Sequence, residues 1–262
     1  MTGSNYLLES GNTKILIDCG LHQGSHFSEK FNWDSFPYNP KEISAVFVTH
    51  PHIDHTGRLP KLAKDGFIGR VYSTPPTRDF ANLLLLDSEH VLLNEAERIK
   101  KPALYNVRDV EELMARWEGV PYHQEIKAGP FKVTLYNAAH VLGSAFILVE
   151  AEGKRIVFSG DLGNSPAPIL GITEQLEEAD YCLIESTYGN RFHPKESSGV
   201  IEDVIEETAK AGGTLMIPAF AMERTQKLLF EINELAEKGR IPKIPVFLDS
   251  PLAIKVTDVY KR

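Results

Sequence analysis

The sequence has little cysteine and no long apolar run. Its 262 residues include only two Cys, Cys19 and Cys182, and each lies at the end of an apolar run. Two isolated cysteines exclude a disulfide framework and favour small core residues in a reducing compartment. No apolar run approaches the roughly 18 residues that cross a bilayer, and no charged segment followed by an apolar one opens the chain. We therefore expect a soluble, cytoplasmic protein without a membrane partner.

Basic residues are also scarce. The 28 Lys and Arg residues are outnumbered by 36 Asp and Glu residues, which gives a formal net charge of −8. A wide basic face for nucleic acid is therefore not expected, although a local basic groove is compatible with this balance. The composition is that of a globular protein, and the length allows one large domain or two unequal ones.

The six residues that follow Thr49 carry three imidazoles and one carboxylate. They belong to His50, His52, Asp54 and His55, in the pattern H-x-H-x-D-H. Crowded imidazoles repel one another when charged and compete for donors when neutral, and a divalent metal ion resolves this conflict. The apolar, β-branched run at 43–48 predicts a buried strand, and a helix is expected soon after the cluster. The cluster is thus expected on a strand-to-helix turn.

The remaining pattern predicts a mixed α/β chain. A hairpin is predicted around Ser10-Gly11-Asn12, residues 21–40 are expected to form a loop with a short helix, and Glu152-Gly153 is expected to form a tight turn. Strands are predicted at 5–9, 14–18, 70–73, 131–136, 145–150, 154–159 and 181–184, the last of them buried, and helices are predicted within 77–100 and 109–117. After residue 195, helices at 198–211 and 223–238 alternate with strands at 214–217 and 246–248, which favours parallel βαβ units.

Two further polar residues follow strand-like runs, His140 after 131–136 and Asp161 after 154–159. Together with the first cluster they make two candidate sites of three ligands each: His50, His52 and His140 in one, and Asp54, His55 and Asp161 in the other. Two neighbouring metal ions can share a hydroxide and clamp the attacking and leaving oxygens of a hydrolysis. Asp18, at the end of its own strand, is a candidate hydrogen-bond acceptor that contacts a ligand rather than the metal and so orients that ligand.

This set of residues, in this order and at strand ends, resembles the metallo-β-lactamase superfamily of hydrolases. The resemblance implies an αββα sandwich with the metals at one edge. It does not name the substrate, because this fold serves many reactions. His and Asp ligands favour Zn²⁺, with two ions expected in the full-length protein and manganese as the alternative.

A second group of motifs resembles the β-CASP nuclease branch of that superfamily. The matching segments are Thr2-Gly3-Ser4, 160–164, 185–189, 218–226 and 248–253. The resemblance spans nearly the whole chain. It implies an RNA-processing endonuclease related to the cleavage-and-polyadenylation endonuclease subunit. It also implies a metallo-β-lactamase domain at 1–195 and the start of a β-CASP domain at 196–262, both incomplete.

The sequence departs from that branch at both ends. It lacks the strand and Gly-rich turn expected before Thr2, and it lacks the returning segment that carries two further His residues. One of those residues acts with the acidic motif and the other completes the second metal site. We therefore expect a fragment with a weaker second site and weak or no activity. A genuine short variant with a one-metal or altered site is the alternative.

The expected reaction is hydrolysis of a single-stranded RNA phosphodiester by in-line attack of a metal-bound hydroxide. The expected catalytic residues are Asp54 and Glu185. Candidate phosphate contacts are Arg191, Arg224 and Lys227, and binding should weaken with salt. The assembly considered is a homodimer.

Three other functions stay open at this point. A thioester or lactone hydrolase of the same fold would not need segments 185–189 and 218–226. A DNA nuclease of the same branch is harder to separate from an RNA nuclease. A non-catalytic partner subunit would be expected to lose ligands, whereas all six are present here.

Overall fold

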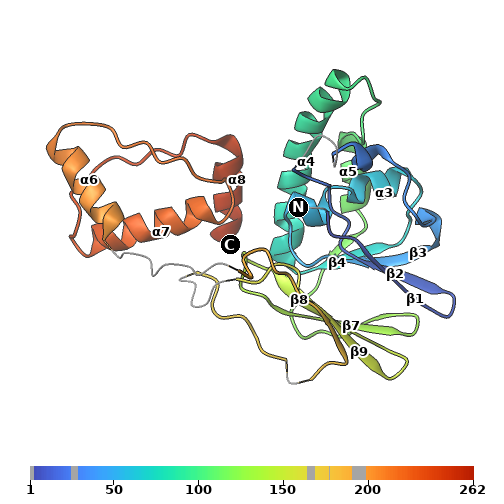
Figure 1. Cartoon of the computed structure of the whole chain (residues 1–262). Coiled ribbons are helices and arrows are strands. Elements are labelled where there is room, and N and C mark those ends of the chain that lie inside the picture. The colour runs from blue at the N-terminus through green and yellow to red at the C-terminus, as the bar shows by residue number, and fades with distance from the viewer. Residues whose placement is uncertain (1–2, 25–28, 164–168, 177, 191–198) are drawn as a thin grey trace. The chain divides into compact units, whose positions relative to one another are not determined.

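The computed structural model describes residues 3–24, 29–163, 169–176, 178–190 and 199–262. Contacts within the chain divide it into two compact units, Met1–Glu185 and Ser186–Arg262, which are described separately below (Figure 1). None of the helices among these described residues is long and apolar enough to cross a membrane.

The first sheet of the first unit has the strand order β1-β2-β3-β4-β5. Its strands are β1 (Tyr6–Ser10), β2 (Thr13–Ile17), β3 (Ile43–Phe47), β4 (Arg70–Ser73) and β5 (Trp117–Gly119). β1 and β2 form the predicted antiparallel hairpin, and every other neighbouring pair is parallel. The carboxyl ends of β2, β3 and β4 therefore share one edge of the sheet.

Helices cover one face of this sheet (Figure 1). They are α2 (Ile53–Thr56), α3 (Leu59–Lys64), α4 (Pro75–Arg98) and α5 (Val107–Met114), and two 3₁₀ turns, η1 (Lys30–Trp33) and η2 (Pro40–Glu42), lie in the loop before β3. Alternate strand residues such as Leu16 and Val46 pack against helix residues such as Leu59 and Leu85. The stretch 77–100, predicted as one or two helices, forms one continuous helix that ends at Arg98, and the side chain of Thr74 caps its start.

The second sheet packs on the other face of the first. Its order is β10-β9-β8-β7-β6, with β6 (Ile126–Ala128), β7 (Phe131–Asn137), β8 (Ala145–Ala151), β9 (Lys154–Phe158) and β10 (Tyr181–Leu183). Only the β9–β10 pair is parallel. Ile17 and Phe47 of the first sheet are buried against Leu135 and Ile147 of the second, so the expected two-sheet sandwich is confirmed.

Two details of the first unit correct the sequence prediction. Trp117 was expected to end a helix, but it begins β5, where its indole donates to the hydroxyl of Ser73. The strand at 181–184 was expected to be buried, but Tyr181 is 57% and Ile184 is 65% exposed. β10 is an edge strand, and a short apolar run does not reveal on which side of a sheet it will end.

The second unit is helical in its described residues. It contains α6 (Val200–Lys210), α7 (Arg224–Glu237) and α8 (Pro251–Tyr260), with a small core that includes Ile205, Leu235 and Ile241. The helices predicted at 198–211 and 223–238 are confirmed. The strands predicted at 214–217 and 246–248 are not formed, and the βαβ alternation is therefore absent from the described part of this unit.

The two missing strands have a common physical explanation. Met216 is 86% exposed and Phe247 is 85% exposed, so neither run gains the burial that stabilises a strand. Short strands also need neighbouring strands on a shared apolar face to persist in water. Helix α8 was not predicted, although Ser250 caps it and Pro251 stands at its first position, a recognisable start signal.

Candidate metal centre

The predicted ligands converge at one edge of the sandwich, because each lies in a segment that follows a strand ending at that edge. His50 and His52 lie in the turn after β3, and Asp54 and His55 in the short helix α2 that follows it. His140 lies between β7 and β8, and Asp161 follows β9. Backbone hydrogen bonds hold the ends together: the Asp18 amide donates to Phe47 O at 2.9 Å, and the Ala145 amide donates to Thr49 O at 2.7 Å. The second of these bonds joins the two sheets beside the histidines.

Four of the predicted ligands form one compact group. Each of His50, His52, His140 and Asp161 offers one donor atom, and these four atoms lie within 4.8 Å of one another. The Nε2 of His140 is 3.2 Å from the Nδ1 of His52. The Oδ2 of Asp161 is 3.8 Å from the Nε2 of both His50 and His140.

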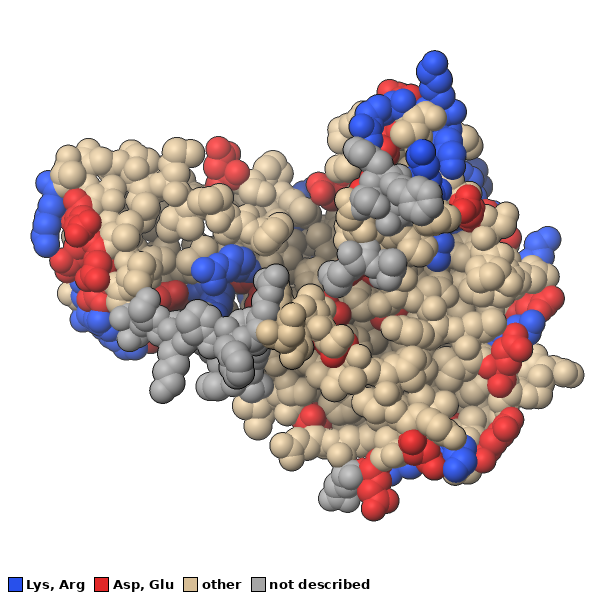
Figure 2. Space-filling model, viewed as in Figure 1, with Lys and Arg blue, Asp and Glu red and all other residues tan. Residues whose placement is uncertain are grey.

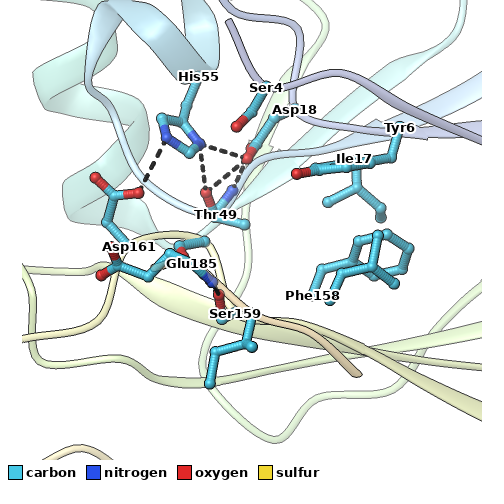
Figure 3. Close-up of a pocket in the computed structure, with 13 residues that line it drawn as sticks. Ser4, Tyr6, Ile17, Asp18, Thr49, His55, Phe158, Ser159, Asp161 and Glu185 are labelled. Atoms are coloured by element: carbon cyan, nitrogen blue, oxygen red, sulfur yellow. Dashed lines mark hydrogen bonds and ion pairs between the residues drawn. The ribbon is translucent and has the colours of Figure 1, made fainter. Parts of the chain in front are cut away.

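The remaining two predicted ligands lie on the other side of Asp161. The Nε2 of His55 is 3.3 Å from the Oδ1 of Asp161 and 3.8 Å from the Oδ2 of Asp54. Figure 3 shows the Asp161 carboxylate directed at the His55 ring. The two oxygens of Asp161 thus face different groups of imidazoles, an arrangement that suits one carboxylate placed between two neighbouring cation sites.

The donor set fits a divalent cation. Among the described residues, the buried Nε2 of His50 has no hydrogen-bond partner, an arrangement that costs free energy unless something binds there. Two nitrogens bound to one tetrahedral zinc at about 2.0–2.1 Å lie about 3.3 Å apart, close to the His52–His140 spacing. Imidazole and carboxylate donors suit zinc and neighbouring transition metals.

Burial and charge divide the histidines into two kinds. Burial, reinforced by the neighbouring imidazoles, holds the pKa of His50 well below its ordinary value, and burial with the nearby His140 lowers the pKa of His52 to about 3. Burial also acts to lower the pKa of His55, but the carboxylates of Asp18 and Asp161 outweigh it and raise this pKa to about 10. His50 and His52 are therefore neutral, the form that binds metals.

The carboxylates respond to the same surroundings. Burial raises the pKa of Asp54. Burial acts in the same direction on Asp161, but its hydrogen bond and charge interaction with His55 outweigh this and lower its pKa. The protonated imidazole of His55 supplies Asp161 with part of the positive charge that a cation would bring.

Asp18 is a buried acceptor at the back of this centre. Its Oδ2 is 2.7 Å from the Nδ1 of His55, and its Oδ1 accepts from the Thr49 amide at 2.8 Å (Figure 3). Its backbone has a φ of +57°, in the left-handed region that costs a non-glycine residue energy. The strained backbone conformation occurs at the residue whose carboxylate contacts the predicted ligand His55.

Two glycines allow the backbone segments that carry the predicted ligands to approach one another closely. A Cβ at Gly160, just before Asp161, would lie 2.7 Å from the Thr49 Cβ, and its φ is +53°. A Cβ at Gly20 would lie 1.6 Å from Asp54 O. Side chains at either position would push apart the segments that carry the predicted ligands.

Glu185 lies beside the centre, at the end of β10. Its Oε1 accepts from the Leu162 amide at 2.9 Å, one residue beyond Asp161, and its own amide donates to the Ser159 hydroxyl at 2.9 Å. Glu185 and Asp161 both line a cavity of about 320 Å³, together with Tyr6 and other apolar side chains (Figure 3).

Sequence reasoning missed the hydroxyl groups that hold this centre. Ser144 Oγ accepts from the amides of His140 and Val141 at 2.9 and 3.1 Å, and Ser159 holds Glu185 as described above. The short spacing between Ser144 and His140 is typical of a side chain that caps a turn, and it could have drawn attention to Ser144.

The predicted phosphate contacts come from residues beyond the first unit. Arg224 and Lys227 belong to helix α7 of the second unit, Arg224 exposed and Lys227 half-buried. Arg191 falls outside the residues that the structure describes.

Comparison with known proteins agrees with this geometry. The model for the metallo-beta-lactamase superfamily matches residues 1–180. The chain belongs to this superfamily. The Beta-Casp domain model matches residues 225–262, which agrees with the resemblance of this segment to the β-CASP branch. The expected fold and family are therefore confirmed.

Similar proteins come from bacteria, archaea and plants. Ribonuclease TTHA0252 of Thermus thermophilus is 37% identical over 264 residues, covering 100% of this chain and 58% of the relative. Transcription termination factor FttA of Methanosarcina mazei is 35% identical, covering 94% of this chain and 39% of the relative. Cleavage and polyadenylation specificity factor subunit 3-I of Arabidopsis thaliana is also 35% identical, covering 94% and 36%. The chain thus spans only part of the length of each relative.

Proposed function

We propose that this chain carries the metal centre of an endoribonuclease that hydrolyses phosphodiester bonds in single-stranded RNA. The observation that carries the proposal is the meeting of six imidazole and carboxylate side chains at one edge of the sandwich. Four of them form one group that includes the unpartnered Nε2 of His50, and Asp54 and His55 lie on the other side of Asp161. The similarity to a protein named as a ribonuclease and to a cleavage and polyadenylation factor supports RNA as the substrate.

The centre would hold two zinc ions, with manganese as the alternative. His50, His52 and His140 would bind the first ion and Asp54 and His55 the second, with one oxygen of Asp161 directed at each. Bound ions of this kind lower the pKa of a bound water and neutralise charge on the phosphoryl oxygens. Asp18 and the other supporting groups would keep the imidazoles oriented for this task.

Two carboxylates are proposed to act on the reacting groups. The carboxylate of Asp54, buried beside His55, would accept a proton from the attacking water. Glu185, at the rim of the cavity, would take part in protonating the leaving oxygen. One of its oxygens accepts from the Leu162 amide, and this hydrogen bond holds the carboxylate beside the loop that carries Asp161.

RNA binding would depend on local charge rather than on the whole surface. On the face drawn in Figure 2, the Lys and Arg residues of the described chain lie among Asp and Glu residues and do not form one broad basic area. Arg224 and Lys227 on α7, with Arg191, are the proposed phosphate contacts. An acidic chain with a few such contacts should release RNA readily as salt is raised.

The expectations of a cytoplasmic location and of a homodimer remain proposals. The two free cysteines are consistent with a reducing compartment. Analytical ultracentrifugation of the purified chain would decide between a monomer and a dimer.

The proposal is tested by single-turnover cleavage of an internally labelled single-stranded RNA, with the metal-loaded chain in excess. We expect slow internal cleavage that a chelator abolishes and that Asp161→Asn lowers by at least about 100-fold. A matched single-stranded DNA and a thioester serve as competing substrates. Cleavage that survives the chelator or Asp161→Asn, or faster hydrolysis of DNA or thioester than of RNA, would contradict the proposal.

A further inference from the structure

The hydroxyl of Thr49 lies among three polar groups, all of them buried. Its Oγ1 is 2.8 Å from the Oδ2 of Asp18, 3.0 Å from the Nδ1 of His50 and 3.4 Å from the Nδ1 of His55. Thr49 itself is 1% exposed, so water cannot replace any of these contacts. The sequence singles out no role for this residue.

Counting donors and acceptors fixes the direction of these hydrogen bonds. A hydroxyl has one proton to donate, and an ionised carboxylate can only accept. The Thr49 proton therefore goes to Asp18, and the hydroxyl oxygen is left as an acceptor for His50. A neutral His50 then carries its proton on Nδ1, and its Nε2 lone pair faces the group formed with His52, His140 and Asp161.

The same carboxylate oxygen also fixes the second group of ligands. Asp18 Oδ2 accepts from the Nδ1 of His55 at 2.7 Å, which directs the Nε2 of His55 toward Asp161 Oδ1 at 3.3 Å. Asp18 thus contacts one of the imidazoles directly and reaches the other only through Thr49.

We propose that Thr49 is a positioning residue that holds His50 in its Nδ1-protonated tautomer, so that one carboxylate, Asp18, orients a ligand of each metal position. The inference rests on the proposed metal centre. Removal of the hydroxyl weakens the first position and leaves the second largely intact, whereas a change at Asp18 weakens both. This difference separates a relay through Thr49 from a purely structural role.

Packing and hydrogen bonding at Thr49 can be separated by two substitutions. The Thr49 side chain lies close against Gly160, where any added Cβ would meet its Cβ and Cγ2. Thr49→Val keeps this branched shape and the backbone amide that donates to Asp18, but it removes the hydroxyl. Thr49→Ser keeps the hydroxyl and removes the methyl group that packs on Gly160.

The first experiment assigns the His50 tautomer by ¹⁵N NMR of the ring nitrogens in the metal-free chain. We expect a proton on Nδ1 in the parent chain and in Thr49→Ser, and a shift toward the Nε2-protonated form in Thr49→Val. An unchanged His50 ring in Thr49→Val would overturn the inference. This readout does not depend on whether the chain binds metal.

The second experiment measures zinc affinity by chelator competition and cobalt binding by its visible absorption. We expect about 10–100-fold weaker binding of the first ion by Thr49→Val, a change of less than about threefold for the second ion, and near-parent values for Thr49→Ser. Asp18→Asn should weaken both. Equal affinities in Thr49→Val and the parent, or equal losses in the Val and Ser variants, would contradict the relay. A parent chain that binds no ion would instead overturn the proposed metal centre.

Discussion

The Nε2 of His140 lies 3.2 Å from the Nδ1 of His52, although 88 positions separate the two residues in the sequence. One residue comes from the turn after β3 of the first sheet, and the other from the connection between β7 and β8 of the second. The edge where the two sheets end together is therefore what creates the centre, and the predictions below test that arrangement.

His140→Ala should remove the first metal ion. The substitution deletes one of three imidazole donors, and this should cost more than the roughly 10–100-fold loss typical of a removed outer partner. Metal content after purification, measured by mass spectrometry, should fall by about one ion per chain. His90→Ala, at an exposed position of α4, is the matched control and should keep its metal. Equal content in both variants would count against the proposed site.

Metal removal should lower the stability of the first unit. A ligand that binds only the folded state at about 100 times its Kd stabilises that state by about 2.7 kcal/mol. For a unit of this size, a chelator should therefore lower Tm by about 5–10 °C. The chelator should lower the Tm of His140→Ala by less, because this variant has already lost the first ion. An equal shift in both proteins would indicate that the chelator acts elsewhere.

Gly160→Ala should damage both stability and metal binding. The new Cβ would stand 2.7 Å from the Thr49 Cβ at a φ of +53°, so we expect a loss of about 3 kcal/mol or more in the free energy of unfolding and weaker binding. Gly153→Ala is the matched control, with a φ of +71° but nothing within 4 Å of an added Cβ. It should cost only about 1–2 kcal/mol and leave metal affinity unchanged. Urea unfolding and metal titration give both quantities.

The two thiols should differ in reactivity. Cys19 is fully buried, and burial raises its pKa to about 11, whereas Cys182 is exposed on the edge strand. The native chain should therefore react with Ellman's reagent at one thiol, and at two only after unfolding. Cys182→Ser should remove the fast reaction. A fast reaction that persists in this variant would show that Cys19 is accessible.

Arg224→Ala should weaken RNA binding and its dependence on salt. If Arg224 contacts one phosphate, its loss should reduce affinity a few-fold and lower the salt slope by about one. Lys210→Ala, which removes an exposed cation of α6 paired with Glu206, is the control and should change neither quantity. Fluorescence anisotropy at several salt concentrations measures both. Equal effects of the two substitutions would remove Arg224 from the proposed contacts.

The convergence of the six candidate ligands could be predicted from the sequence because each is marked locally. The H-x-H-x-D-H pattern is dense, and His140 and Asp161 both follow recognisable strand-like runs. Strands of one sandwich tend to present such turns at a common edge, so an argument from spacing could anticipate their meeting. The structure places four of the six in one compact group, with His55 beside Asp161 and Asp54 beside His55.

Other features depend on tertiary contacts that a local pattern does not encode. The runs at 214–217 and 246–248 are as apolar as true strands, but strand formation also requires a partner and a face to bury. The proposed role of Thr49 follows from the group to which its hydroxyl donates. That group is the carboxylate of Asp18, 31 positions away. Such hydroxyl groups carry no periodicity that a sequence reading could detect.

The proposed function requires cations bound at the edge where the two sheets end together. Anomalous diffraction at the zinc edge, on crystals of the chain grown with zinc, tests this directly. We predict one peak about 2.0–2.1 Å from the Nε2 of His50 and a second beside the Nε2 of His55, with Asp161 between them. Anomalous peaks only at surface sites, with the His50 ring left unbound, would contradict the account.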